Sequence, residues 1–263
     1  DPVLRLGDMG ARACRVPQIR AWVPRCPSRL CSKRPTRERH GRLEVRNEPA
    51  RPATRGTVAI KLYAHPFSNN SMRAQLYLEE KGLPYEYVTV DLFKGEHRQP
   101  PYLAINPRGQ VPCIVDDGIT VFESVAIVQY LEHRYPEPPL IPRDPVAMAK
   151  CIRLIAEFNQ KLDPTNIFGS VKFRGMRRAE LGERLEKLMA ECRTWEGYLD
   201  DQPFFAGDEY SIADIIVLPF FGMAIDGLGL PERDFPRLHR WYERCKQRPN
   251  VAKQPWFQAF AAE

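Results

Sequence analysis

From residue 57 onward the chain alternates short apolar runs with helix-forming runs, and this alternation constrains its fold more than any other feature. Residues 58–64 (V-A-I-K-L-Y-A) are β-favouring and stop at a His-Pro pair. Residues 68–71 are helix-capping types that precede M-R-A-Q-L-Y-L-E-E-K, and Gly82 closes that helix. Residues 85–90 predict a second strand. Residues 96–105 predict a short helix or loop.

The next segment predicts a hairpin followed by a helix. Residues 111–115 and 119–122 are apolar runs on either side of Asp-Asp-Gly, a hairpin signal. A helix then opens at Glu123-Ser124. Its apolar residues have helical spacing, which predicts that one face is buried: Ile127, Val128, Leu131 and Tyr135. The predicted order is βαβαββα, an α/β domain over residues 57–138.

Beyond this domain the pattern becomes helical. Residues 136–145 contain five prolines and no periodicity, which indicates an interdomain linker, set at 139–145. An all-helical domain is predicted over 146–263. Two features support it: Ser211 and Asp214 match a capping box before an apolar run, and one apolar stripe has four-and-three spacing. The stripe consists of Leu181, Leu185, Leu188, Cys192, Trp195 and Leu199.

Residues 1–56 are rich in Arg and Pro without apolar periodicity, which predicts a disordered basic extension. It carries 14 of the 39 basic residues and 5 of the 33 acidic ones, so the remainder is close to neutral with 25 against 28. That balance argues against a nucleic-acid partner for the folded part. Three interpretations of the extension stay open: an organellar targeting peptide, a functional basic tail, and translated upstream sequence.

The composition also limits metals, membranes and location. Seven scattered cysteines without a C-x-x-C pair predict neither a disulfide framework nor a zinc site, and no metal site is expected. No apolar run approaches the roughly 18 residues that span a bilayer, so no membrane partner is expected. We predict a cytoplasmic protein, or an organellar one if residues 1–56 are a transit peptide.

Several motifs in the same order resemble the soluble glutathione S-transferase superfamily. K-G-E-H-R, N-P-R-G-Q-V-P and F-E-S-V-A-I-V-Q-Y-L, within residues 91–135, are similar to its glutathione-binding half. F-F-A-G-D-E-Y-S-I-A-D resembles its helical-domain signature. The resemblance covers residues 58–263 and implies a thioredoxin-like N-terminal domain, an all-α C-terminal domain, glutathione as co-substrate, a hydrophobic electrophile and a homodimer.

Such an enzyme must favour the glutathione thiolate, because a free thiol titrates above neutral pH. A hydroxyl donor at a helix N-terminus favours the anion, and Ser68 stands at that place. By its distance from Lys81-Gly82, Ser68 matches the catalytic serine of the phi and zeta classes. Ser68 could instead only cap the helix. Asn70 and Ser71 stay open as rival activators.

The resemblance also implies which residues bind glutathione. A cis proline at Pro112 turns the Val111 backbone toward the cysteinyl backbone of the ligand, beside Gln110. Glu123 and Ser124, at a helix N-terminus, take the γ-glutamyl ammonium and carboxylate. Two further basic residues bind the glycyl carboxylate: His97 and Arg98.

The predicted function is activation of the glutathione thiolate for conjugation to electrophiles or for reduction of organic hydroperoxides. The absence of Cys between His65 and Arg73 argues against thiol transfer. S-N-N-S-M-R departs from the S-T-x-T form of phi and the S-S-C-x-x-R form of zeta enzymes. Maleylacetoacetate isomerase-like activity and a non-catalytic ligand-binding role stay as alternatives. Four aromatics that could line an electrophile pocket are assigned to neither pocket nor core: Phe168, Phe173, Phe220 and Phe221.

Overall fold

The computed structural model describes residues 60–256, so the predicted extension over 1–56 lies outside the described residues. The N-terminal domain contains the predicted order βαβαββα, with a 3₁₀ turn over Glu96–Arg98 before its second helix. Its elements are β1 (Ile60–Ala64), α1 (Asn69–Glu80), β2 (Tyr85–Thr89), α2 (Pro100–Leu103), β3 (Cys113–Asp116), β4 (Ile119–Phe122) and α3 (Ser124–Arg134).

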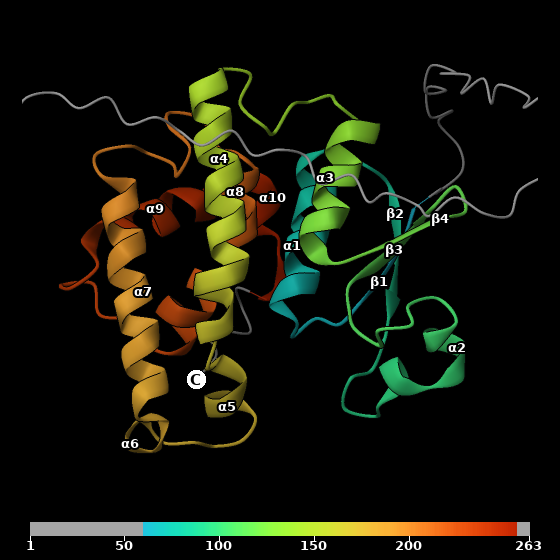
Figure 1. The fold of residues 1–263 in the computed structure, drawn as a ribbon, viewed down its shortest axis with the longest axis horizontal. Helices are drawn as coiled ribbons and strands as arrows, with labels where there is room; N and C mark the ends of the chain where they lie inside the picture. The colour runs from blue at the N-terminus through green and yellow to red at the C-terminus, as the bar shows by residue number, and fades with distance from the viewer. Residues whose placement is uncertain (1–59, 257–263) are drawn as a thin grey trace, which may run out of the picture. The chain divides into compact units, whose positions relative to one another are not determined.

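The four strands form one mixed sheet in the order β2-β1-β3-β4. β1 pairs in parallel with β2 and antiparallel with β3, and β3 pairs antiparallel with β4. The hairpin turn places Asp117 and Gly118 at φ 49° and 80°, the two positive values that a type I′ turn requires. Figure 1 shows α1 and α3 between the sheet and the helical domain, with α2 on the other side of the sheet.

A buried carboxylate fastens α3 to this hairpin. Asp116 at the end of β3 is fully buried. It accepts hydrogen bonds from the hydroxyls of Tyr130 (2.9 Å) and Tyr135 (2.9 and 3.0 Å). Tyr135, predicted to be buried with the apolar face of α3, is only half-buried because its ring carries this polar tip. These contacts fasten the C-terminal half of α3 to the sheet.

The rest of the described chain is helical after an irregular proline-rich stretch. Within residues 60–256, no helix is long and apolar enough to cross a membrane. The predicted stripe from Leu181 to Leu199 is interrupted at Gly182, where φ is 49°. The helices are α4 (Pro145–Glu157), α5 (Phe168–Lys172), α6 (Arg178–Leu181), α7 (Glu183–Leu199), α8 (Ile212–Gly222), α9 (Pro236–Lys246) and α10 (Pro249–Ala252), with π-helical segments over Phe158–Leu162 and Met223–Gly227.

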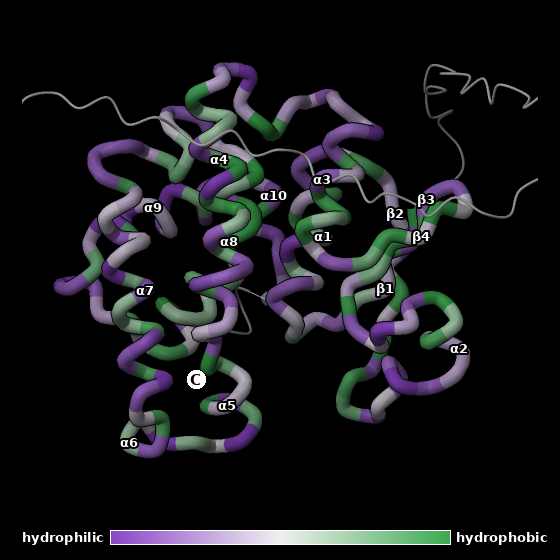
Figure 2. The backbone as a smooth tube through the Cα atoms, in the orientation of Figure 1, coloured by the Kyte–Doolittle hydropathy of each residue, from purple (hydrophilic) through white to green (hydrophobic). Residues whose placement is uncertain are grey.

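Helix α8 is the centre of the helical domain, because every one of its residues is buried. Figure 2 shows it as hydrophobic along most of its length. The predicted capping box is present, with Asp214 accepting from the backbone N–H and the hydroxyl of Ser211 at 2.9 and 3.0 Å. Asp214 also accepts from the Phe205 N–H (3.0 Å) and the Trp241 indole (2.8 Å). One carboxylate thus joins three segments of this domain.

We expect Asp214→Ala to lower the free energy of unfolding by about 3 kcal/mol, because it leaves several buried donors without an acceptor. Ser211→Ala removes one capping interaction and should cost about 1 kcal/mol. Denaturant unfolding followed by circular dichroism measures both. Equal losses for the two variants would contradict a joining role for Asp214.

Candidate active site

A cavity of about 860 Å³ lies where α1, α3 and the loop before β3 meet the helical domain. Its lining includes all eight residues for which the sequence predicted a role: Ser68, His97, Arg98, Gln110, Val111, Pro112, Glu123 and Ser124. These residues come from four separate segments of the N-terminal domain. Two residues of the helical domain, Asn159 and Asp163, complete the wall.

Ser68 is the N-cap of α1, with extended backbone angles. Its Oγ accepts a hydrogen bond from the Ser71 N–H at 3.3 Å. A serine hydroxyl that accepts in this way still has its own proton to donate. Capping and donation into the cavity are therefore compatible, and the free N–H groups of the helix end add a favourable field for an anion.

The structure separates the two rival residues. Ser71 is buried, does not line the cavity, and its Oγ accepts from the His65 N–H at 3.2 Å. Asn70 does line the cavity. Its Oδ1 accepts from Arg73 (2.6 Å) and from the Ser124 hydroxyl (3.2 Å), which leaves its NH₂ group to donate. Asn70 is thus the rival that the geometry leaves open, whereas Ser71 supports the loop.

Two side-chain hydrogen bonds fix the loop before β3. The Gln110 carbonyl accepts from the Tyr102 hydroxyl (2.6 Å) and the Asn106 amide (2.8 Å). The Val111–Pro112 peptide bond is cis, as the family resemblance implied. The Val111 N–H and C=O have no hydrogen-bond partner within residues 60–256. An extended peptide backbone could pair with them as an added strand.

A glycine brings this loop against the turn that carries the basic residues. Gly109 has φ 60°, and a Cβ there would lie 2.8 Å from the His97 carbonyl oxygen, so a larger residue would force the two segments apart. The Nδ1 atom of His97 is buried without a hydrogen-bond partner among the described residues. Such an atom in a cavity wall is a ready donor or acceptor for a ligand. Arg98 and Arg108 also line the cavity and add positive charge to its wall.

An acidic part of the cavity wall lies at the N-terminus of α3. Glu123 has φ 70°, a left-handed conformation that costs about 1 to 3 kcal/mol for a non-glycine residue. Its side chain makes no capping hydrogen bond, so ordinary helix capping does not account for this carboxylate. Ser124 differs from expectation. Its hydroxyl is buried and donates to Asn70, so in this arrangement the backbone N–H groups of α3 are the donors available to a ligand carboxylate.

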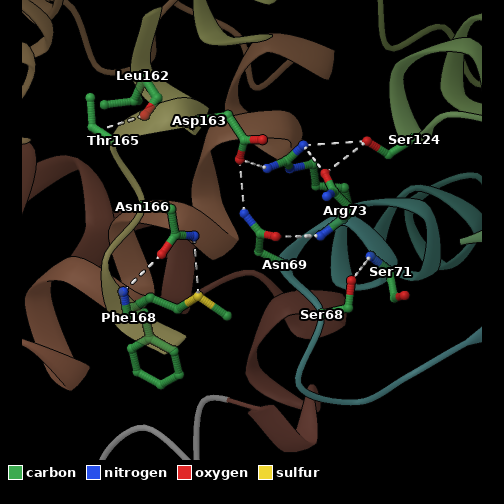
Figure 3. A network of polar contacts seen from close by, with 12 residues as sticks. Ser68, Asn69, Ser71, Arg73, Ser124, Leu162, Asp163, Thr165, Asn166 and Phe168 are labelled. Atoms are coloured by element: carbon green, nitrogen blue, oxygen red, sulfur yellow. Dashed lines mark hydrogen bonds and ion pairs between the residues drawn. The ribbon is translucent and has the colours of Figure 1, made fainter. Parts of the chain in front are cut away.

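A buried guanidinium connects the starts of α1 and α3 to the helical domain (Figure 3). Arg73 of α1 is fully buried and donates to Asp163 (2.8 Å), Asn70 (2.6 Å) and Ser124 (3.3 Å). Its guanidinium also lies 4.2 Å from the centre of the Phe158 ring. Burial lowers the pKa of Arg73, and the ion pair with Asp163 opposes that effect. Sequence patterns assigned no role to Arg73 or Asp163, because their partners are distant in the chain.

The described residues contain no group of three or more His, Cys, Asp or Glu side chains that could hold a metal ion. No cysteine lines the cavity. The nearest in sequence, Cys113, is buried, and burial raises the pKa of its thiol to about 11. The site thus offers hydroxyl and amide donors, a helix terminus, and both acidic and basic side chains to a polar ligand.

Comparison with known proteins identifies the family. Residues 62–139 match the model of the glutathione S-transferase N-terminal domain, and residues 158–249 match that of the C-terminal domain. A zeta-class glutathione S-transferase of Euphorbia esula is 34% identical, covering 72% of this chain and 87% of its own. Maleylacetoacetate isomerase of Pseudomonas aeruginosa is 32% identical, covering 69% and 88%.

A solved structure of a glutathione transferase homologue from Drosophila mojavensis, with bound glutathione, matches with a TM-score of 0.70 and 25% identity. The match covers 78% of this chain and 95% of that one. Both domains, their order and their fold thus agree with what the motifs implied. The chain belongs to the glutathione S-transferase family.

Proposed function

We propose that this protein is a glutathione transferase in which the Ser68 hydroxyl and the N-terminus of α1 stabilise the glutathione thiolate. The observation that carries the proposal is the position of Ser68. It caps α1, keeps a donatable proton and lines a cavity whose wall carries both acidic and basic residues. An anion at this place gains both a hydrogen bond and the field of the helix end.

The charges of the cavity suggest how glutathione lies in it. The γ-glutamyl group, with its ammonium and carboxylate, fits between the Glu123 carboxylate and the N–H groups of α3. The glycyl carboxylate fits the cationic end formed by His97, Arg98 and Arg108. The cysteinyl backbone then runs along Val111, beside Gln110 and Pro112, and its sulfur lies toward Ser68.

A second cavity, of about 520 Å³, borders the other side of the same turn. Phe67 and Asn69 line it, whereas Ser68 and Asn70 line the first cavity, so successive residues face alternate cavities. We propose that the second cavity holds the electrophile, because a group there lies across the turn from the thiolate. Conjugation at carbon and reduction of organic hydroperoxides both use that thiolate.

The proposal extends to the assembly and the location of the protein. The family resemblance leads us to propose a homodimer with a two-fold interface. The four described cysteines are buried and unpaired, which supports a reducing compartment such as the cytoplasm.

The similarity to maleylacetoacetate isomerase favours a second candidate function. Isomerisation would use the same thiolate, because reversible addition of sulfur to a conjugated double bond allows rotation about it. Isomerisation differs from conjugation because it releases glutathione unchanged at the end of the reaction. The Ser68 turn differs from the S-S-C-x-x-R form, with Asn69 and Asn70 in place of Ser and Cys, and conjugation therefore remains our leading proposal over isomerisation and over a ligand-binding role.

The decisive experiment is a titration of bound glutathione by thiolate absorbance in wild type and Ser68→Ala. We expect the substitution to raise the pKa of the bound thiol, with about 1.4 kcal/mol of lost thiolate stabilisation for each pH unit. Turnover near neutral pH should fall, while glutathione affinity changes much less, because the lost interaction favours the reactive anion. Loss of the cap alone should cost about 1 kcal/mol of stability.

Ser71→Ala is the matched control, because it removes a neighbouring hydroxyl that does not line the cavity. It should leave the titration curve in place. Superimposable curves for wild type and Ser68→Ala, together with a shifted curve for Asn70→Ala, would transfer the activating role to Asn70.

We predict that Glu123→Gln weakens glutathione binding by about 1.5 to 3 kcal/mol, because the γ-glutamyl ammonium loses a charged partner. Steady-state kinetics should show a raised glutathione KM with a smaller change in kcat. Glu186→Gln, an exposed position on α7 outside the cavity, removes the same charge and should change neither value. An unchanged KM in Glu123→Gln would limit this residue to a structural role.

We predict that Asp163→Asn acts on both stability and binding. It leaves the Arg73 charge buried without its anionic partner, which should lower the free energy of unfolding by about 3 kcal/mol. It should also raise the glutathione KM, because Arg73 orients Asn70 and Ser124 at the cavity wall. Asp214→Ala supplies a control of similar instability. Both variants are assayed below their unfolding temperatures. If Asp214→Ala raises the glutathione KM as much as Asp163→Asn does, Asp163 does not position the site.

A further inference from the structure

The second cavity has a chemical character of its own, because rings and cations dominate its wall. Phe67, Phe168 and Phe173 line it, as do the guanidinium groups of Arg174 and Arg184. Asn69, Asn166 and Ser170 supply short polar groups. Among the residues that line it, there is no carboxylate. This set differs from the purely apolar wall that a simple hydrophobic electrophile would need.

The aromatic part of the wall is partly exposed to solvent. Phe67 and Phe173 line the cavity and are 42 and 48% exposed. Phe93, which is 66% exposed, contacts both of them, although the three residues are distant in the sequence. Their ring centres are 5.6 to 6.3 Å apart in edge-to-face contacts. Phe173 also meets the buried Phe168 at 6.1 Å. Exposed rings held in this way present flat faces and edges to a planar ligand.

Arg174 and Arg184 are available to bind an anionic ligand, because neighbouring carboxylates among the described residues do not pair with them. Arg184 donates to the hydroxyl of the buried Ser170 at 3.0 Å, which directs it along the cavity wall. Two acidic residues close to it in the chain pair with other cations, Glu180 with Arg177 and Glu183 with Lys187, and no carboxylate within residues 60–256 forms an ion pair with Arg184. Arg174 has no ion-pair partner within residues 60–256. The positive charge at this cavity is therefore not neutralised by the described residues.

We propose that the electrophile is an aromatic compound that carries a carboxylate, with its ring against Phe67 and Phe173 and its carboxylate on Arg174 and Arg184. A planar guanidinium matches a carboxylate in two parallel hydrogen bonds, which a neutral substrate cannot supply. This inference rests on the proposed thiolate chemistry at Ser68 and names the substrate class for it. In the test reaction, the thiolate sulfur attacks the ring carbon that bears chlorine. The C–S bond forms, the C–Cl bond breaks, and chloride leaves with the electron pair.

The test compares 4-chloro-3,5-dinitrobenzoate with its neutral carboxamide. Each kcat/KM is divided by the uncatalysed rate constant with glutathione at the same pH, which removes intrinsic reactivity. We expect the normalised value for the carboxylate to be at least about tenfold higher, as for a hydrogen bond to a charged group. Arg174→Gln and Arg184→Gln should each reduce this ratio several-fold. Arg177→Gln, which removes an equal charge outside the cavity, should leave the ratio unchanged.

A binding measurement separates this inference from the proposed function. Calorimetry compares S-(4-carboxybenzyl)glutathione with S-benzylglutathione, which requires no turnover. Tighter binding of the carboxylated conjugate, lost in Arg174→Gln, supports the inference even if neither chloride is displaced. Equal affinity of the two conjugates, or a normalised kinetic ratio near one, overturns it and leaves glutathione transfer intact. Failure of both conjugates to bind overturns the glutathione site and the inference together.

Discussion

The ion pair between Arg73 and Asp163 is the interaction on which the arrangement of this site depends. It joins α1 of the N-terminal domain to the helical domain, and Arg73 is fully buried at 2.8 Å from its partner. A guanidinium without water needs acceptors in several directions. Asp163, Asn70 and Ser124 supply them, together with the face of Phe158. Satisfying one buried charge therefore also orients two residues of the cavity wall.

The proposed chemistry uses the N-termini of two helices to stabilise the charged groups of the ligand. In the proposed complex, the N-terminus of α1 faces the thiolate and that of α3 faces the γ-glutamyl carboxylate; both helix starts line the cavity through Ser68 and Ser124. Each of the two helices is held in place by its own hydrogen bonds. Ser68 and Ser71 tie the start of α1 to the His65 backbone, and Asp116 holds α3 through two tyrosine hydroxyls. Because these supports are hydrogen-bonded or buried, the donors face the ligand with little reorganisation.

The turn that carries Ser68 divides two chemically different spaces. The wall of the first cavity contains both acidic and basic residues, which suits the zwitterionic tripeptide that we propose for it. The second cavity has aromatic rings and uncompensated guanidinium groups, which suits a flat anion. Residues 67 to 70 line the two cavities alternately, and in our proposal this brings glutathione and the electrophile to the same thiolate. Substrate choice can then change through α5 and the start of α7 without alteration of the thiolate site.

The prediction for Ser68 shows what local sequence can supply. A β-favouring run, a capping serine and a helix closed by Gly82 are near neighbours, so their spacing alone predicted that Ser68 caps a helix, and the structure confirms this cap at the N-terminus of α1. The capping box at Ser211 and Asp214 was predictable for the same reason, and the structure confirms it. The βαβαββα order, the helical domain and the family likewise follow from contiguous motifs and local periodicity.

Only the tertiary structure decided how these parts cooperate. Local patterns left both Ser71 and Asn70 open as alternative activators of the thiolate. Packing separates them, because Ser71 is buried away from the cavity whereas Asn70 lines it. Phe220 and Phe221 proved to be core, whereas Phe173 is exposed beside Phe67, more than a hundred positions away. Arg73 meets Asp163 at a separation of 90 residues. Capping and periodicity act over a few residues and can be read along the chain, whereas burial, ion pairing and cavity walls depend on segments that only folding brings together.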